Sequence, residues 1–354
     1  MPDLLTPTTA SPPSRWRFRL LRAGSFKLDG GSMFGLVPRV VWSKSVPADD
    51  KGRITVQHNC LLLDRVGPGE GPRRVLVEVG TGEKLEPRMR EVFSLEVNPE
   101  TGKPRTVVDA LADAGATPES IDAIVVTHLH FDHAGALTRL ARPGETPDWP
   151  CPPNTDGGGG SAQTGGCRRT FPNASIFVQR REWADATANR SVMTKTYYPD
   201  HLWPIEPQLS LIDSPRPFPP GLIPDRDQDP QAPVELRETE LWPGSGITVF
   251  LVPGHTWGQQ AIKFREPDPQ TTPYSQGRTI VFTPDVMPTV NHLGAAYSLA
   301  YDVEPYTSMV SRRWFLAEAA RSGWVLCLDH EPGHPLVRVR ENTKGWFDLT
   351  PEPE

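Results

Sequence analysis

The 354-residue sequence has few of the features that direct a chain into a membrane or out of the cell. It contains no run of about 18 apolar residues, so we expect no transmembrane helix. Residues 1–15 are rich in Pro, Ser and Thr and lack the apolar segment of a signal peptide, which predicts a cytoplasmic protein. Only four cysteines are present, and none forms a CxxC pair, which excludes a dense disulfide framework.

The four cysteines occur in two kinds of surroundings. Cys60 and Cys327 lie in apolar, strand-like runs, which favours buried free thiols. Cys151 and Cys167 flank a polar loop and could be bridged, although a reducing cytoplasm would keep them apart. The sequence leaves this second pair open.

The chain also lacks an excess of basic residues. Its net charge of −6 gives no footprint for a polyanion, so we expect a small-molecule substrate and neither nucleic acid nor a membrane as partner. A homo-oligomer remains open. The 40 prolines and 30 glycines predict many loops between short elements, and the 37% hydrophobic share is typical of a globular chain.

Strand-like and helix-like segments alternate along most of the chain. We expect one domain over residues 15–345, with tails at 1–14 and 346–354. Two low-complexity, Pro- and Gly-rich stretches, near 143–166 and 214–233, predict surface insertions. Hairpins occur in both halves, which favours two sheets covered by helices over one doubly wound parallel sheet.

Local patterns place the elements of this domain. The longest helix should run from Pro305 to Ser322, followed by Gly323 as its C-terminal glycine. Its expected apolar stripe consists of Tyr306, Met309, Val310, Trp314 and Ala317. Shorter helices are expected at 84–96, 105–114 and 180–188. Strands are expected at 15–21, 54–66, 73–79, 121–126, 175–179, 247–252, 260–264, 279–282, 324–328 and 336–340.

The strongest chemical signal is the segment THLHFDHAG at residues 127–135. It places His128, His130, Asp132 and His133 within six residues, directly after a buried strand. Imidazole and carboxylate together suit Zn²⁺ and related divalent ions, and a tight turn after a strand is a rigid support for them. The segment therefore predicts a metal site.

This segment resembles the HxHxDH signature of the metallo-β-lactamase superfamily, and three later segments extend the resemblance. They are PGHTWG at 253–258, FTPD at 282–285 and LDH at 328–330, in the order that the family has them. The resemblance covers residues 15–345 and implies an α/β fold, the αββα sandwich of that family.

The resemblance also implies a ligand set for two divalent ions, zinc or alternatively manganese, iron or cobalt. His334 competes with His330, but His330 lies at the end of an apolar strand, where a rigid ligand would lie. The implied ligands are His128, His130 and His255 for one metal, Asp132, His133 and His330 for the other, and Asp285 between them.

The implied activity is hydrolysis by a hydroxide that bridges the two metals. Asp132 is the expected catalytic residue, because it can orient this nucleophile and then carry its proton to the leaving group.

Two residues depart from the family pattern. Pro284 stands before the bridging aspartate, where the family has glycine. The first apolar strand ends in Glu78-Val79-Gly80 rather than Asp-x-Gly. Glu78 would either orient a ligand histidine or be a solvent-facing charge at a strand end, and both interpretations stay open.

Further segments resemble a lactonase-like branch that includes N-acyl homoserine lactonases: DGGSMFG at 29–35, NHL at 291–293 and AYDVEP at 300–305. The resemblance implies that Met33 and Phe34 form an apolar wall of the substrate site, unless they are ordinary core residues. Lactonases have a tyrosine where this chain has Pro288, so His292 or Tyr301 is the expected substrate contact and oxyanion donor.

These observations predict a metal-dependent hydrolase acting on a lactone or carboxylic ester, such as an N-acyl homoserine lactone. The alternatives are a phosphoester or organophosphate hydrolase on the same fold, a non-catalytic metal-binding member, and a redox protein of the flavodiiron type.

Overall fold

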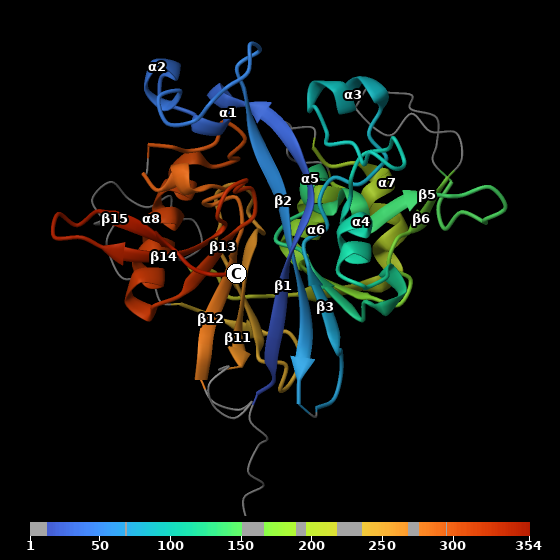
Figure 1. Cartoon of the computed structure of the whole chain (residues 1–354). Coiled ribbons are helices and arrows are strands. Elements are labelled where there is room, and N and C mark those ends of the chain that lie inside the picture. Colours follow the sequence, from blue (N-terminus) through green and yellow to red (C-terminus); the bar gives the residue numbers. More distant parts are fainter. Residues whose placement is uncertain are drawn as a thin grey trace, which may run out of the picture.

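The structure is a computed structural model that describes residues 13–67, 69–150, 166–188, 196–217, 236–267, 276–294 and 296–354. Most of the N-terminal tail and of the two expected insertions, together with Cys151, therefore lies outside the described residues. Two large sheets lie face to face at the centre of the molecule, and helices cover both outer faces (Figure 1).

The first sheet begins with long antiparallel strands and continues with short parallel ones. The expected hairpin of residues 54–66 and 73–79 is confirmed, because its two strands pair antiparallel. In the described part of the chain the order of the strands is β1 (Arg15–Asp29), β2 (Arg53–Val66), β3 (Arg74–Val77), β4 (Ala123–Val125), β7 (Ser175–Gln179) and β8 (Leu209–Ile212).

The second sheet is antiparallel apart from the parallel pair β12–β13. Its described strands are, in order, β15 (Phe347–Pro351), β14 (Leu336–Glu341), β13 (Val325–Leu328), β12 (Gln276–Thr283), β11 (Gln260–Pro267), β10 (Ile247–Leu251) and β9 (Thr239–Glu240). A separate ribbon pairs β5 (Thr138–Leu140) with β6 (Cys167–Arg169).

The expected C-terminal tail at 346–354 is wrong for its central part. Residues 347–351 form β15, which pairs with β14 and closes one edge of the second sheet. The alternation that marks a strand is weak there, and the backbone pairing with β14 stabilises it instead.

Helices fill the outer layers, and all but one are short. The described α-helices are α1 (Gly30–Phe34), α2 (Arg39–Trp42), α3 (Pro87–Val92), α4 (Val107–Asp113), α5 (Phe131–Ala134), α6 (Arg180–Thr187), α7 (Pro199–Leu202) and α8 (Pro305–Ser322). The 3₁₀ turns are η1 (Pro118–Ser120), η2 (Gly135–Leu137), η3 (Trp203–Gln208) and η4 (Val290–His292). Among the described helices, none combines the length and the apolar composition that crossing a bilayer requires.

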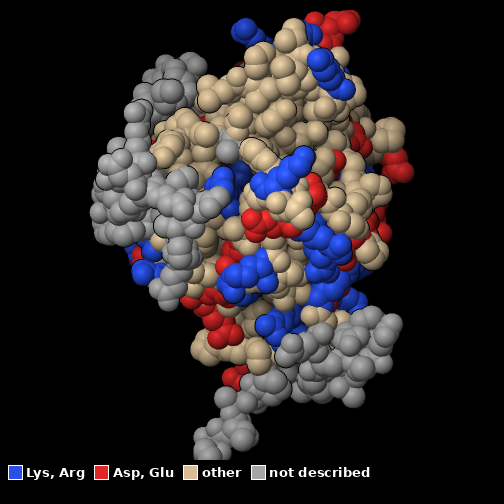
Figure 2. Space-filling model, turned by 90° about the vertical axis from the view of Figure 1, so that its left-hand side faces the viewer, with Lys and Arg blue, Asp and Glu red and all other residues tan. Residues whose placement is uncertain are grey.

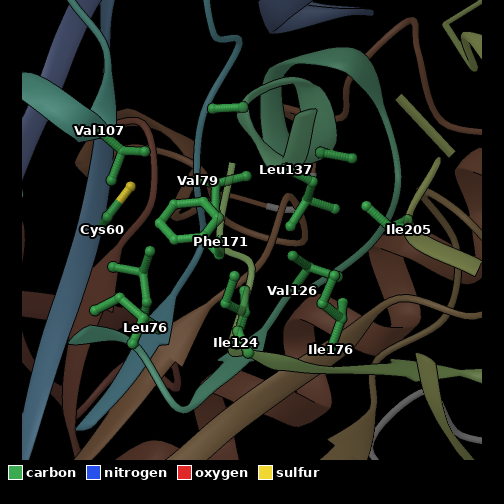
Figure 3. Close-up of a cluster of buried hydrophobic side chains, with 14 of the residues drawn as sticks. Cys60, Leu76, Val79, Val107, Ile124, Val126, Leu137, Phe171, Ile176 and Ile205 are labelled. Atoms are coloured by element: carbon green, nitrogen blue, oxygen red, sulfur yellow. The ribbon is translucent and has the colours of Figure 1, made fainter. Parts of the chain in front are cut away.

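Three apolar layers hold the sandwich together. Between the sheets, side chains such as Phe18 and Leu63 meet Phe264 and Phe282 of the opposite sheet. Beneath the helices of the first sheet lies a second cluster (Figure 3), which includes Cys60, Leu76, Val107, Ile124, Leu137, Phe171, Ile176 and Ile205. The third lies between α8 and the second sheet. This arrangement is the expected αββα sandwich.

The long helix α8 has the expected bounds, and Gly323 ends it in the left-handed conformation at φ +66°. Its expected apolar stripe is wrong in part, because Tyr306 is 42% exposed and Ala317 is also exposed. The buried face instead includes Arg312, which donates hydrogen bonds to the carbonyls of Val286 and Tyr297. These polar contacts turn the helix away from the orientation that apolar spacing alone predicts.

On the side of the molecule where α8 and β15 lie, basic and acidic side chains are interspersed (Figure 2). Charges of both signs at short spacing cancel one another beyond about 10 Å at moderate salt. This face therefore offers no extended field of one sign to attract a polyanion.

Candidate metal centre

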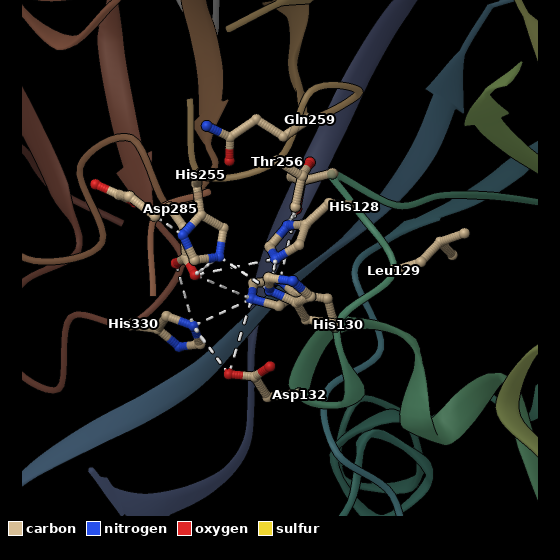
Figure 4. Close-up of polar contacts among 12 residues, drawn as sticks. His128, Leu129, His130, Asp132, His255, Thr256, Gln259, Asp285 and His330 are labelled. Atoms are coloured by element: carbon tan, nitrogen blue, oxygen red, sulfur yellow. Dashed lines mark hydrogen bonds and ion pairs between the residues drawn. The ribbon is translucent and has the colours of Figure 1, made fainter. Parts of the chain in front are cut away.

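Four strand ends deliver the candidate ligands to one edge of the sandwich. His128 follows β4 of the first sheet, while His255, Asp285 and His330 follow β10, β12 and β13 of the second. Strand β12 is parallel to β13, and β10 runs in the same direction because both pair antiparallel with β11. The carboxyl ends of these strands consequently lie at the same edge, and their side chains converge (Figure 4).

The turn that carries His255 is held against α8 by a glycine. Gly254 has φ +138°, and a Cβ atom there would lie 2.4 Å from the Cα of Ser308. The carbonyl of Gly254 also accepts a hydrogen bond from the backbone N–H of Glu304, at 2.9 Å. Only glycine allows so close an approach, so the PGH sequence fixes the position of His255 relative to the helix.

A first cluster, which we call the three-histidine cluster, consists of His128, His130 and His255. Nδ1 of His130 lies 3.1 Å from Nε2 of His128 and 3.0 Å from Nε2 of His255. Ligands around a tetrahedral zinc ion with Zn–N bonds of 2.0–2.1 Å are separated by about 3.3 Å. The three ring nitrogens therefore have the spacing that a metal ion requires.

The protonation of two histidines of this cluster also suits a metal. Burial lowers the pKa of His128 and His130 well below its usual range, and the neighbouring histidines lower it further. Both rings are thus held in the neutral form that binds metal ions.

A second cluster, which we call the carboxylate-rich cluster, consists of His133, Asp285, Asp329 and His330, whose ligand atoms all lie within 4.8 Å of one another. Nε2 of His330 lies 3.2 Å from Nε2 of His133. Asp132 is beside them, with Oδ2 at 3.7 Å from Nε2 of His330. Imidazole and carboxylate donors in this proximity suit a divalent ion.

Asp285 lies between the two clusters. Its Oδ2 is 3.1 Å from Nε2 of His255, 4.0 Å from that of His128 and 3.7 Å from that of His133. Its Oδ1 is 3.4 Å from Nε2 of His330. Burial raises the pKa of this carboxyl, but the surrounding histidines more than offset it and hold the pKa well below its usual range. An ionised carboxylate with one oxygen toward each cluster can bridge two metals.

In four of the five histidines of the clusters the ring nitrogen that faces away from the cluster has a partner, whereas Nε2 of His130 has none among the described residues. Such contacts fix the orientation and the tautomer of a metal-binding histidine. They are His128 Nδ1 with Thr127 Oγ1 at 3.0 Å, His133 Nδ1 with Glu78 Oε2 at 3.2 Å, His255 Nδ1 with Asp302 Oδ1 at 3.0 Å, and His330 Nδ1 with the Gln57 carbonyl at 2.9 Å.

The role of Glu78, which the sequence leaves open, is settled by its position. The side chain is buried, and besides contacting His133 it accepts a hydrogen bond from the backbone N–H of Thr127. Its φ of +65° is unusual for a residue other than glycine. Burial lowers the pKa of His133, but Glu78 and Asp132 more than compensate and raise it well above the usual range. Glu78 therefore orients His133 and is not a surface charge.

Three of the expected substrate contacts are core residues. Met33 and Phe34 are buried in a cluster with Trp42 and Val56, which supports the packing interpretation over the apolar wall. His292 stacks on Phe34, with ring centroids 5.0 Å apart. Its Nε2 contacts the Met33 carbonyl at 2.8 Å, and its Nδ1 contacts a threonine hydroxyl at 2.8 Å. With both nitrogens engaged and the ring buried, His292 offers nothing to a substrate.

Tyr301 stays accessible in part. Burial raises the pKa of its hydroxyl, and the charges of Asp29, Asp132 and Asp285 raise it further, so the hydroxyl remains a hydrogen-bond donor. Pro288, which stands where lactonases have tyrosine, uses its carbonyl to accept a hydrogen bond from the backbone N–H of His330 at 3.0 Å. Position 288 therefore supplies a backbone contact to the site and no side-chain donor.

An apolar group that the sequence analysis missed adjoins Asp132. Leu85, Phe131 and Tyr198 form its buried part, and the half-buried Met89, Phe93 and Leu95 pack against them. The rings of Phe93 and Phe131 stack with centroids 4.9 Å apart. Burial, together with the charge of Asp132, raises the pKa of Tyr198 to about 12. The signal in the sequence is Phe131 itself, which stands between two candidate ligands.

Comparison with known proteins points to one superfamily. Residues 53–165 match the model of the metallo-beta-lactamase superfamily, and no curated protein matches the sequence. A probable metal-dependent hydrolase from Staphylococcus aureus is 21% identical, with a TM-score of 0.69 over 97% of this chain and 99% of that one. By this match the segment 53–165 is similar to the metallo-β-lactamase superfamily, and the chain as a whole has the fold of that hydrolase.

Two further structures of similar fold have a TM-score of 0.61. AidC, a dizinc quorum-quenching lactonase in complex with its product, is 17% identical. The alignment covers 97% of this chain and 99% of AidC. AbOPH, described as a hydrolase of the beta lactamase superfamily, is 15% identical. The alignment covers 98% of this chain and 99% of AbOPH. At such identities the likeness establishes the fold. The match to the metallo-beta-lactamase model and these structures together support a metal-dependent hydrolase, and the two His/Asp clusters fit divalent metal ions.

Proposed function

We propose that this protein hydrolyses a lactone or a carboxylic ester with an apolar acyl group, such as an N-acyl homoserine lactone. The observation that carries the proposal is the apolar group around Phe131, next to Asp132. The residues that would hold two zinc ions are His128, His130 and His255 for one, Asp132, His133 and His330 for the other, and Asp285 for both.

The chemistry of the site requires an electrophile and a way to move one proton. Two divalent ions, when bound, would polarise the oxygen of the electrophile and lower the pKa of the attacking water. Asp132 is suited to accept the proton of the attacking water and to deliver it to the leaving oxygen, as a general base and then acid. Its side chain is 11% exposed, so it borders both the ligand atoms and the solvent.

The surroundings of Asp132 support an acyl group as the recognition element. Met89, Phe93 and Leu95 are only half buried, so an alkyl chain lying on them would remove apolar surface from water. Such burial contributes about 25 cal/mol for each Å² covered. A multiply charged phosphate ester would gain nothing from this surface, and the net charge of −6 would not attract it.

Structures of similar fold lend support from another direction. AidC is described as a lactonase with N-hexanoyl-homoserine product, and an N-acyl homoserine lactone hydrolase with N-hexanoyl-L-homoserine bound at its metal centre is 19% identical, with a TM-score of 0.54. We assign the oxyanion contact that Pro288 cannot make to the hydroxyl of Tyr301, because the residue is only partly buried and burial raises its pKa, so that it keeps the proton it would donate.

The test is a substrate panel with the metal-replete enzyme. We expect hydrolysis of N-acyl homoserine lactones, with kcat/KM rising as the acyl chain lengthens from four to about eight carbons. Asp132→Asn should lower kcat about 10²–10⁴-fold, the usual contribution of general acid–base catalysis. Phe93→Ala should weaken the dependence on chain length and leave kcat for the shortest lactone nearly unchanged.

Phosphotriesters and aryl esters are the alternative substrates in this panel. Efficient cleavage of phosphotriesters by an enzyme that ignores every lactone and ester would overturn the proposal and identify an organophosphate hydrolase. An enzyme that binds two metals but hydrolyses none of these substrates would also contradict it.

A further inference from the structure

Asp329 is a buried carboxylate without a donor. It follows the last residue of β13 and precedes His330, and its exposure is only 2%. Neither of its carboxylate oxygens has a hydrogen-bond partner among the described residues. A buried ionised carboxylate is strongly unfavourable unless a cation or several donors compensate it.

Other buried carboxylates of this protein are compensated, which makes Asp329 distinctive. Glu182 accepts hydrogen bonds from the backbone N–H of Leu129 and from the hydroxyls of Tyr197 and Thr256. Glu331, two residues after Asp329, accepts from two backbone N–H groups, at 3.0 and 2.8 Å. The fold thus supplies donors where a carboxylate is purely structural, and it supplies none at Asp329.

The side chain of Asp329 is directed into the carboxylate-rich cluster. One of its oxygens lies within 4.8 Å of the ligand atoms of His133, Asp285 and His330. Oδ1 of Asp285 is likewise buried and without a hydrogen-bond partner. The main chain cannot swing the residue outward, because the Asp329 carbonyl accepts a hydrogen bond from the backbone N–H of Asn59 at 2.9 Å. When both are ionised, two such neighbouring carboxylates repel each other unless a cation lies between them.

We propose that Asp329 is a direct ligand of the metal ion at the carboxylate-rich cluster, in addition to the seven residues that the family pattern implies. This position would then have two imidazoles and three carboxylates, whereas the three-histidine cluster has three imidazoles and one shared carboxylate. Carboxylate oxygen suits harder ions such as Mn²⁺ better than imidazole does. The two positions therefore differ in metal preference, and this conclusion does not depend on the substrate.

The experiment measures metal binding by the full-length protein directly. Metal-free wild type, Asp329→Asn and Asp329→Ala are titrated with Zn²⁺ and separately with Mn²⁺ by calorimetry, and bound metal is counted after dialysis. We expect both variants to bind the first equivalent normally and the second at least about 100-fold more weakly, the upper end of what loss of an indirect contact causes. The preference of the second position for Mn²⁺ over Zn²⁺ should also fall.

Glu331→Gln is the matched control, because it removes a buried carboxylate from the same loop without touching the cluster. It should bind both equivalents as wild type does. Asparagine at 329 can still donate a hydrogen bond to Asp285, so a variant with unchanged second-site affinity would show that Asp329 only positions Asp285. That result would overturn the proposal.

Thermal unfolding supplies a second readout that a merely structural role would not produce. Without metal, Asp329→Asn removes a buried carboxyl group that has no hydrogen-bond partner among the described residues, so its melting temperature should not fall below that of metal-free wild type. With metal, the same variant should melt below wild type, because it gains less from binding. Equal losses in both states would contradict a ligand role. Failure of the lactone panel would leave these measurements unaffected.

Discussion

The three-histidine cluster and the carboxylate-rich cluster lie side by side but differ in charge. The first consists of imidazoles, and burial lowers the pKa of His128 and His130. Burial acts in the same direction on His255, but Asp285 and Asp302 raise its pKa to about 10. In the second, burial acts in the same direction on His133, but Glu78 and Asp132 raise its pKa well above the usual range. Negative charge thus accumulates on one side of Asp285. We infer that similar histidines can serve two unlike metal positions because the carboxylates around them differ.

The ligands of a single local motif are also divided between the two clusters. His128 and His130 belong to the first cluster, whereas Asp132 and His133 lie at the second. The change occurs where α5 begins at Phe131, since the helical turn redirects the side chains that follow. Two metal positions therefore share one rigid support, which couples their geometry.

The largest effect should come from the residue that joins the clusters. Asp285→Ala removes the carboxylate that faces both positions, so we expect both metals to bind weakly and hydrolysis to fall at least about 10³-fold. Elemental analysis and kcat measurements on the reconstituted protein test this. A variant that retains two tightly bound metals would show that the clusters do not depend on a shared carboxylate.

Smaller losses of metal affinity should distinguish the two clusters from each other. Glu78→Gln weakens the orientation of His133 in one cluster, and Asp302→Asn does the same for His255 in the other. Each should lower metal affinity about 10–100-fold, but at different positions. Stepwise titration with Zn²⁺ should show the loss in the second equivalent for Glu78→Gln and in the first for Asp302→Asn. Identical titration curves for both variants would contradict the division.

The smallest effect concerns acid stability that is independent of either cluster. Burial, followed by the charge of Lys84, lowers the pKa of His201 from an ordinary 6.5 to about 3. The unfolded chain therefore binds a proton here that the folded chain does not, so this residue destabilises the fold as the pH falls from about 6.5 toward 3.

His201→Gln tests this contribution in metal-free protein, where acid release of metal plays no part. The variant should lose less of its free energy of unfolding between pH 7 and pH 4 than wild type, as followed by urea denaturation. A pH dependence identical to that of wild type would assign the acid lability to other groups.

Much of the fold followed from local patterns. The capping box of Thr106 and Asp109 and the following Gly115, at φ +68°, explain why helix α4 lies within the expected 105–114. Apolar runs between turn residues located β2, β3, β7 and β10 to within a few residues. The short ribbon β5–β6 and the edge strand β15 were missed, because their stability comes from pairing with distant segments.

Sequence alone could identify the seven candidate ligands, because each stands in a short motif at a strand end and the spacing within a motif is local chemistry. Only the tertiary structure could decide which of the remaining residues lie in the core and which lie at the site. Met33, Phe34 and His292 have the composition of a substrate site, yet they are buried in a core whose other members lie far away in the sequence. Glu78 and Asp329 resemble ordinary strand-end charges until the segments that follow neighbouring strands bring His133 to one and Asp285 to the other. Burial and the identity of a partner are properties of the packed sandwich, so no local pattern encodes them.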